Sequence, residues 1–133
     1  MPIRQANDRF DAPEMMQLFQ AEWCPASRRV RELLTELDVS YVIRQVPVDR
    51  ADRDELFAVA GSRVIPALVL KSGTALIDES EIRTWLQDHV PTPAGAARHR
   101  AKAESMRRLE IEGARSEPAH PHSLDTPQLE VSR

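Results

Sequence analysis

The sequence has a single cysteine, and its neighbours give it the setting of a reactive thiol. Cys24 follows a short apolar run and precedes Pro25, which suits the first turn of a helix because its missing N–H has no intrahelical partner there. A thiol at a helix N-terminus lies near unpaired backbone N–H groups and the positive end of the helix dipole. Both favour the thiolate, and cysteine pKa values in such settings fall from about 8.5 to roughly 3.5–7.5. We therefore expect Cys24 to act as a nucleophile; the alternative is an inert buried cysteine.

Neighbouring side chains define what such a thiol can do. Ser27 lies one helical turn after Cys24, where its hydroxyl can donate a hydrogen bond to the sulfur, and Arg28 and Arg29 can add positive charge. Ser27 cannot resolve a mixed disulfide as a second cysteine would. Exchange must therefore be monothiol: Cys24 attacks, a small thiol accepts, and the intermediate is released intermolecularly. Trp23 is expected to pack or to form a partly exposed lip.

A second candidate feature is Ile65-Pro66, directly before an apolar strand-like run. If the X–Pro bond is cis, it turns the backbone of Val64 and Ile65 outward and leaves N–H and C=O groups free. Those groups can pair with an extended, peptide-like ligand in the manner of strand addition. The alternative is a trans proline at a strand edge, which is the commoner arrangement.

A third feature is Glu79-Ser80, at the start of the last predicted helix of the domain. Free N–H groups at that helix end, together with the Ser80 hydroxyl, can hold a carboxylate, and Glu79 can meet an ammonium group. The alternative is simple N-capping of the helix. The three features can converge at one end of a sheet, which predicts one compact site.

The elements that position these residues follow from hydrophobic periodicity and capping signals. Residues 15–19 and 41–46 read as strands, and residues 67–77 read as a hairpin. The expected helices carry buried faces or capping boxes, at Val30/Leu33/Leu34/Leu37, at Asp52/Glu55 with Gly61 closing, and at Asp78/Glu81 followed by Ile82/Trp85/Leu86/His89. The order β-α-β-α-β-β-α predicts an α/β domain with a four-stranded mixed sheet, helices on both faces and a C-terminal tail.

The composition changes near residue 91. We expect an N-terminal arm over residues 1–13, one folded domain over 14–90 and a partly helical to disordered tail over 91–133. Within the tail, residues 94–114 are rich in Ala, Arg and Glu and read as a loosely held helix that Gly113 ends. Residues 116–133 read as disordered.

The composition as a whole excludes several classes of protein. The 133 residues carry a net charge of −3 and 41% hydrophobic residues, so no global basic footprint for nucleic acid is present. No apolar run approaches the ~18 residues of a membrane span, and the N-terminus has no apolar signal region. One cysteine cannot form an internal disulfide or a multi-cysteine zinc site, so no metal is expected. A reducing cytoplasmic setting is expected.

The motifs in this order resemble the thioredoxin-like superfamily, on the side of glutaredoxins and glutathione S-transferase N-terminal domains. The matching pieces are the strand MMQLFQ, then WCPAS in the place of the glutaredoxin CPYC or CPYS, then VIPALV, then ALIDESEIRTWL. The resemblance covers about residues 14–90. It implies a thioredoxin-like fold, Cys24 as nucleophile with Ser27 in the place of the second cysteine, and glutathione or another low-molecular-weight thiol as co-substrate.

The resemblance also implies the ligand-binding residues. Ile65 becomes the backbone clamp beside a cis Pro66, and Glu79 and Ser80 contact the γ-glutamyl group. The full set of glutathione-binding residues expected is Trp23, Pro25, Val64, Ile65, Pro66, Glu79 and Ser80. One departure is Gln20, which stands where glutaredoxins have a lysine four residues before the cysteine.

The leading hypothesis for function is a monothiol glutaredoxin-like oxidoreductase acting on glutathione mixed disulfides, with small-molecule thiols and protein disulfides as partners and a monomer or weak dimer as the working form. The alternative is a non-catalytic thioredoxin-like module that binds a thiol ligand or a protein partner. Transferase activity is less expected, because the 43 residues after the domain are too few for a transferase's helical domain. A third hypothesis gives the tail's basic residues an anionic partner, but interleaved glutamates favour a solvated helix over nucleic-acid or membrane binding.

Overall fold

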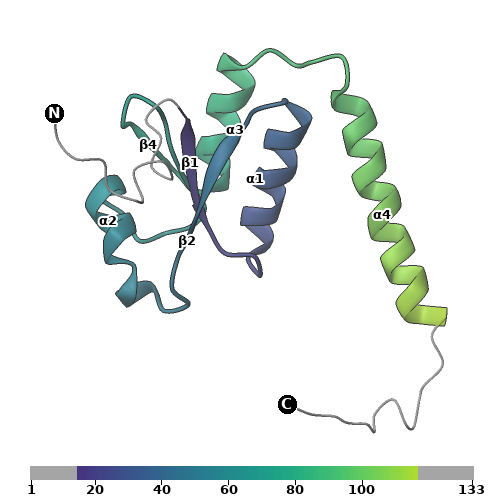
Figure 1. The fold of residues 1–133 in the computed structure, drawn as a ribbon, viewed down its shortest axis with the longest axis horizontal. Coiled ribbons are helices and arrows are strands. Elements are labelled where there is room, and N and C mark those ends of the chain that lie inside the picture. The colour runs from purple at the N-terminus through teal and green to yellow at the C-terminus, as the bar shows by residue number, and fades with distance from the viewer. Residues whose placement is uncertain (1–14, 117–133) are drawn as a thin grey trace, which may run out of the picture. The chain divides into compact units, whose positions relative to one another are not determined.

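The computed structural model describes residues 15–116 (Figure 1). The first strand, β1 (Met16–Gln20), leads through a short turn into α1 (Pro25–Glu36), and β2 (Tyr41–Gln45) follows. A short 3-10 turn, η2 (Arg50–Asp52), precedes α2 (Asp54–Ala60). The hairpin β3 (Ala67–Val69) and β4 (Ala75–Ile77) then leads directly into α3 (Asp78–His89), and α4 (Ala96–Ser116) is the last described helix.

The four strands form one mixed sheet in the order β2-β1-β3-β4. The pair β1 and β2 is parallel, whereas β1 pairs antiparallel with β3 and β3 pairs antiparallel with β4. A parallel pair needs a crossover, which α1 supplies, and the antiparallel edge comes from a tight hairpin in which Gly73 takes a positive φ of 97°. The predicted α/β class and element order are therefore confirmed.

Helices cover both faces of the sheet (Figure 1). Successive side chains on a strand point to opposite faces, so β1 sends Leu18 to one face and Phe19 to the other. Leu18 belongs to the larger core, where α1 and α3 pack with the sheet; its buried members are Leu18, Val30, Leu33, Leu34, Leu37, Leu68, Leu76, Ile82 and Leu86. Phe19 belongs to a smaller core with α2, together with Leu56, Ala67 and Val69.

The start of α2 differs from the expected capping box. The helix begins at Asp54 with Arg53 as its N-cap residue and no side-chain cap, so the predicted pairing of Asp52 with Glu55 is wrong. Asp52 lies instead in η2, and Glu55 forms an ion pair with Arg44 of β2. The predicted closure at Gly61 is confirmed, because Gly61 takes the left-handed conformation at φ 69° and donates its N–H to the last turn of α2.

Contacts divide the chain into two units, the first ending at His99 and the second beginning at Arg100. The expected helix in the tail is present as α4, but it continues through Gly113 to Ser116, so Gly113 does not end it. A glycine inside a helix lowers its stability without breaking the hydrogen-bond ladder. Along α4, Met106, Leu109 and Ile111 are exposed. The prediction of disorder over 116–133 is wrong for Ser116, which lies in α4. The predicted arm over 1–13 and the rest of that segment, 117–133, lie outside the described residues.

None of the helices within residues 15–116 combines the length and the apolar character that crossing a membrane requires.

Candidate functional site

Cys24 caps the N-terminus of α1. Its backbone is extended at φ −84° and ψ 118°, and its N–H donates to the Ala21 carbonyl at 3.1 Å, which closes the turn after β1. The Cys24 sulfur accepts the backbone N–H of Ser27 at 3.4 Å. The thiol is partly exposed, so it is accessible while lying on the first turn of the helix. The pattern of Pro25 after Cys24 therefore placed the thiol correctly.

The surroundings of Cys24 favour its thiolate. Partial burial acts to raise the pKa of the Cys24 thiol, but the hydroxyl and N–H of Ser27, the N–H of Ala26 and the charge of Arg29 lower it by more in total. The net effect is a pKa below the ordinary value of a cysteine. A thiolate that is both populated and reachable is the species that attacks disulfides.

Ser27 fixes the turn beside the sulfur. Its side chain is fully buried, and its hydroxyl oxygen accepts the N–H of Ala21 at 3.4 Å. A buried hydroxyl with both a donor and an acceptor role is well satisfied. Ser27 thus connects the end of β1 with the start of α1 and bonds to the sulfur at the same time.

Trp23 and Pro25 flank the sulfur on the surface. Trp23 is 61% exposed and Pro25, at the first helical position, is also exposed. Trp23 is therefore a lip beside the thiol and not a core residue. A large exposed aromatic side chain next to an accessible thiolate offers apolar area to an incoming ligand.

Arg29 connects the thiol with Glu79 of α3. Its guanidinium forms a bidentate pair with the Glu79 carboxylate at 2.8 and 2.9 Å, and Arg83 contacts the same carboxylate at 3.3 Å. Chiefly through the hydrogen bonds of Arg29, this arrangement lowers the pKa of Glu79. The same pairing raises the pKa of Arg29, and its bidentate geometry holds the guanidinium near Cys24. Arg28 is exposed and is not among the groups that shift the thiol.

The segment before β3 forms the second part of the site. The Ile65–Pro66 peptide bond is cis, and Pro66 is buried while Val64 and Ile65 are half-buried. The Pro66 carbonyl accepts the N–H of Asp78 at 2.9 Å, which joins this segment to the start of α3. Among residues 15–116, no hydrogen bond is formed by the backbone N–H or C=O of Ile65. These two groups remain available to a ligand.

The start of α3 is capped more fully than expected. Asp78 takes a positive φ of 64°, and its carboxylate accepts the N–H groups of Ser80 and Glu81 at 3.0 and 3.3 Å. The carboxylate of Glu81 in turn accepts the N–H of Ile77 at 2.8 Å. The predicted capping box is therefore present, except that Glu81 bonds to the N–H of Ile77 and not to that of Asp78. Two of the N–H groups expected to be free for a carboxylate are therefore already paired. The exposed Ser80 hydroxyl is what this helix end offers a ligand.

The sheet register brings Cys24, the cis-proline segment and the start of α3 to one end of the sheet. Gln20 at the end of β1 lies beside Gln45 at the end of β2, and Phe19 pairs with Ala67 at the start of β3. Ala67 in turn pairs with Ile77 at the end of β4. The turn to Cys24, the cis-proline segment and the start of α3 all follow or precede these strand ends, so they meet at the same end of the sheet.

Gln20 has a structural role at the position where glutaredoxins carry a lysine. Its side chain is fully buried; its amide nitrogen donates to Gln45 at 3.1 Å, and its amide oxygen accepts from Arg31 of α1. These partners occupy both ends of the amide, so Gln20 provides no charge to Cys24. The positive charge near the thiol comes from Arg29.

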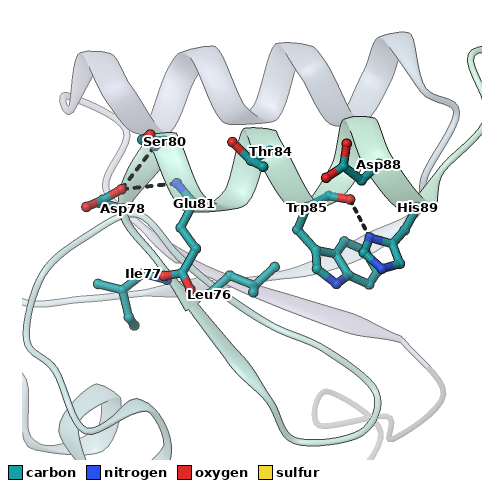
Figure 2. A pocket seen from close by; sticks show the side chains of 9 residues that line it. All are labelled: Leu76, Ile77, Asp78, Ser80, Glu81, Thr84, Trp85, Asp88 and His89. Atoms are coloured by element: carbon teal, nitrogen blue, oxygen red, sulfur yellow. Dashed lines mark hydrogen bonds between the residues drawn. The ribbon is translucent and has the colours of Figure 1, made fainter.

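An open cavity of about 470 Å³ lies beside the start of α3 (Figure 2). Figure 2 shows the capping Asp78 at one end and the rings of Trp85 and His89 face to face at the other, with centroids 4.4 Å apart. Ser80 lines this cavity, whereas Glu79 pairs with Arg29, because consecutive helical residues point about 100° apart. Cys24 does not line it.

Sequence reasoning missed this cavity and the ion pair that joins α1 to α3. The spacing of Trp85 and His89, four residues apart on a helix, was a usable signal for the ring stack. The pairing of Arg29 with Glu79 spans 50 residues of sequence and has no local signal. Of the predicted site residues, the structure joins Cys24 to Ser27 directly and to Glu79 through Arg29, and it places Ser80 on the neighbouring surface.

One protein family and several solved structures are similar to this chain. The family described as glutathione S-transferase, N-terminal domain, matches residues 23–89. A glutathione S-transferase from Sinorhizobium meliloti 1021 is similar at 24% identity and a TM-score of 0.53, over 57% of this chain and 32% of that one. One from Rhodospirillum rubrum F11 is similar at 24% identity and a TM-score of 0.50, over 62% and 40%. A buckwheat glutaredoxin–glutathione complex has a TM-score of 0.48 at 17% identity, over 62% of this chain and 78% of that one. No curated protein matches the chain.

The sheet order and the cysteine that caps α1 define a thioredoxin-like domain. The chain belongs to the glutathione S-transferase N-terminal domain family, whose match covers half of its length. The chain spans only about a third to two fifths of the two transferases it resembles.

Proposed function

We propose that the chain is a monothiol, glutaredoxin-like thiol–disulfide oxidoreductase that uses glutathione or a similar small thiol. The observation that carries the proposal is Cys24 itself: an accessible sulfur on a helix N-terminus, with its pKa lowered by Ser27, Ala26 and Arg29 against the effect of burial. Membership of the glutathione S-transferase N-terminal domain family supports a glutathione-type ligand.

The first half of the reaction forms a mixed disulfide on the protein. The Cys24 thiolate attacks the glutathione sulfur of a protein–glutathione disulfide, a Cys24–glutathione disulfide forms, and the protein thiolate leaves and takes a proton. Because Ser27 stands in place of a second cysteine, no internal thiol competes for this intermediate.

The second half regenerates the free thiolate. A second glutathione thiolate attacks the glutathione sulfur of the intermediate, which releases glutathione disulfide and restores the Cys24 thiolate. Overall, one protein–glutathione disulfide and one free glutathione become one protein thiol and one glutathione disulfide, whose other half comes from the mixed disulfide. Arg29 and the first-turn N–H groups stabilise Cys24 as the leaving thiolate.

The ligand groups are proposed residue by residue from the family resemblance. The backbone N–H and C=O of Ile65, which have no partner within residues 15–116, fit strand-like pairing with the cysteinyl part of glutathione. Val64 and Pro66 shape that segment, and Trp23 and Pro25 supply the exposed lip. Glu79 would receive the γ-glutamyl ammonium on the lone pair that Arg29 and Arg83 leave open. The Ser80 hydroxyl would meet the adjacent carboxylate.

Mass spectrometry after incubation with glutathione disulfide tests the proposal. We expect a single glutathione adduct on Cys24, removed by an excess of reduced glutathione, and no adduct on Cys24→Ser. A steady-state assay with a glutathionylated peptide then measures turnover, and Ser27→Cys, which adds a second thiol one turn after Cys24, is the comparison. A wild-type chain that stays unmodified under conditions where free cysteine reacts contradicts the proposal.

A non-catalytic binding module is the second candidate. The observation that favours it is that internal partners already occupy much of the ligand end: Arg29 and Arg83 on Glu79, and Asp78 on two helix N–H groups. This candidate predicts that glutathione binding survives Cys24→Ser and that the wild type shows no turnover above that variant.

A further inference from the structure

Arg53 is a buried cation that the proposed reaction does not use. It is only 6% exposed, although it stands at the N-cap of α2, where the helix dipole disfavours positive charge. Its guanidinium donates three hydrogen bonds to backbone carbonyls: to Pro47 at 2.9 Å, to Val48 at 2.9 Å and to Arg63 at 3.0 Å. A buried charge with this many carbonyl acceptors indicates a position that the fold requires to be filled by arginine.

These bonds join two segments that lie before and after α2. The carbonyls of Pro47 and Val48 belong to the connection from β2, whereas the Arg63 carbonyl belongs to the loop that leads into β3. Arg63 bonds in the opposite direction, because its guanidinium donates to the Ala51 carbonyl at 3.1 Å and pairs with Asp54 at 2.9 Å. Arg53 and Arg63 therefore both connect the chain at the start of α2 with the loop that follows α2. We call these bonds of Arg53 and Arg63 the brace.

The brace ends next to the segment that a ligand would contact. Arg53 holds the Arg63 carbonyl two residues before Ile65, and Asp78 holds the Pro66 carbonyl one residue after it. Val64 and Ile65 lie between these fixed points. The backbone groups of Ile65 are then oriented by the brace and not by partners of their own within the described residues.

We propose that Arg53 is a positioning residue that sets the affinity of the site for an extended thiol ligand by fixing the backbone of Val64 and Ile65. The inference rests on the proposed function, since it takes Ile65 as the ligand clamp. Arg53 bonds to carbonyls on the α2 side and has no bond to the Cys24 helix, so it acts on ligand binding and not on thiol reactivity.

Lysine cannot replace arginine in this brace. The guanidinium is a planar fork whose donors reach three carbonyls in fixed directions, whereas an ammonium is a single point at the end of a flexible stem. Arg53→Lys keeps the charge but leaves these partly buried carbonyls without their donor, and it loosens the loop that carries Arg63. Arg50→Lys is the matched control, because Arg50 lies on η2 three residues earlier and is exposed.

The test compares the full-length wild type, R53K and R50K. Calorimetry measures the Kd of S-methylglutathione, which binds without reacting; iodoacetamide measures the pH profile of Cys24 alkylation; and NMR measures exchange of the Val64 amide, which donates to Ser62 at 3.1 Å. For R53K we expect a Kd raised about fivefold or more, faster Val64 exchange and an unchanged alkylation profile. R50K should match the wild type in all three.

Each other outcome has a defined meaning. A wild-type Kd in R53K overturns the proposal, and so does an alkylation profile that shifts with the Kd. If the wild type itself does not bind S-methylglutathione, the assignment of glutathione as the ligand in the proposed function fails. Val64 exchange then tests the brace alone: unchanged exchange in R53K refutes it, and faster exchange upholds it.

A second variant keeps the test decisive if R53K does not fold. Ser62→Ala removes the bond to the Val64 N–H and loosens the same segment without touching the buried cation. We expect faster exchange in the 61–66 segment together with a raised Kd. If exchange becomes faster while the Kd stays at the wild-type value, fixation of the segment does not govern affinity and the proposal falls.

Discussion

One guanidinium serves two anions at this site. Arg29 lies on α1 five residues after Cys24, where its charge lowers the thiol pKa, and it also forms a bidentate pair with Glu79 of α3. The pairing matters for the thiol because an exposed arginine without a partner samples many rotamers. Holding Arg29 on a carboxylate keeps its charge near the sulfur while leaving the sulfur itself uncovered.

Removing that charge has a predictable sign. Arg29→Met takes away a group that favours the thiolate, so the pKa of Cys24 rises and the alkylation rate near neutral pH falls. In the wild type, the rate reaches half of its maximum at a lower pH than for a free cysteine, because the folded-state pKa lies below the ordinary value. Iodoacetamide alkylation between about pH 5 and 10 measures both effects, because this range covers the pKa values of ordinary cysteines and of many activated ones.

Arg28→Met is the control for this experiment. Arg28 is adjacent, exposed and of the same charge, but it is not among the groups that shift Cys24. Its alkylation profile should follow that of the wild type. Equal shifts in both variants would mean that the effect is one of net charge and not of the Arg29–Glu79 pair.

At this scale the sequence predicts the thiol and names Arg28 and Arg29 as possible sources of positive charge, but it does not predict that Arg29 pairs with Glu79. The Cys24-Pro25 pair predicts the position of the thiol at a helix start, because a helix start depends on residues that are adjacent in the sequence. The pairing of Arg29 with Glu79 depends on how α1 and α3 lie on the sheet. From the sequence alone, Arg28 was an equally good candidate for this role, because it is adjacent and carries the same charge. The same limit explains why Ser80 was grouped with Glu79, although adjacent helical residues face different surfaces.

Helix ends show which local signals survive packing. Gly61 closes α2 as predicted, because only a left-handed residue continues the chain there. The Asp52–Glu55 capping signal failed because Asp52 lies in η2 and buried Arg53, which bonds to three backbone carbonyls, takes the N-cap position of α2. A pattern based on side-chain caps does not foresee an arginine that satisfies backbone groups.

Two glycine substitutions separate conformation from packing. A Cβ at Gly61 meets no atom within 4 Å, so the cost of Gly61→Ala comes from its φ of 69° and should be about 1 kcal/mol of unfolding free energy. Gly113 lies within α4, also in open space, and Gly113→Ala should add helicity instead. Urea unfolding and far-UV circular dichroism measure the two effects. A stabilised G61A would contradict the left-handed cap.

The packing of α1 gives a larger effect. Leu34 of α1 is fully buried in the core that α1 and α3 form with the sheet. Leu34→Ala should therefore reduce the unfolding free energy by about 2–5 kcal/mol. Leu109 on α4 is 56% exposed, and Leu109→Ala should change it by no more than about 0.5 kcal/mol. Urea midpoints at equal m-values compare the two variants. Similar losses in both would show that Leu109 is covered in solution.

At the scale of the whole molecule, the order of elements follows from local sequence patterns, whereas the extent of a compact unit depends on contacts between distant residues. Alternating strand and helix periods were enough to predict the order of elements and hence the mixed sheet, because a parallel pair needs a crossover and a hairpin needs a tight turn. The end of the folded domain stays a prediction at residue 90, drawn from prolines and falling hydrophobicity. By contacts the first compact unit runs to His99, and Ala96 is 3% exposed.

Truncation tests whether the site depends on the second unit. Every residue proposed for catalysis or ligand binding lies between Trp23 and Ser80, and the family match ends at residue 89. A chain of residues 1–99 should therefore keep the urea midpoint of the first unit and form the Cys24–glutathione adduct at the full-length rate. A chain of residues 1–90, which lacks the buried Ala96, is the comparison and should unfold at lower urea. If the 1–99 chain folds but reacts slowly, residues 100–133 contribute to the site, and the proposed assignment of the chemistry to the first unit is wrong.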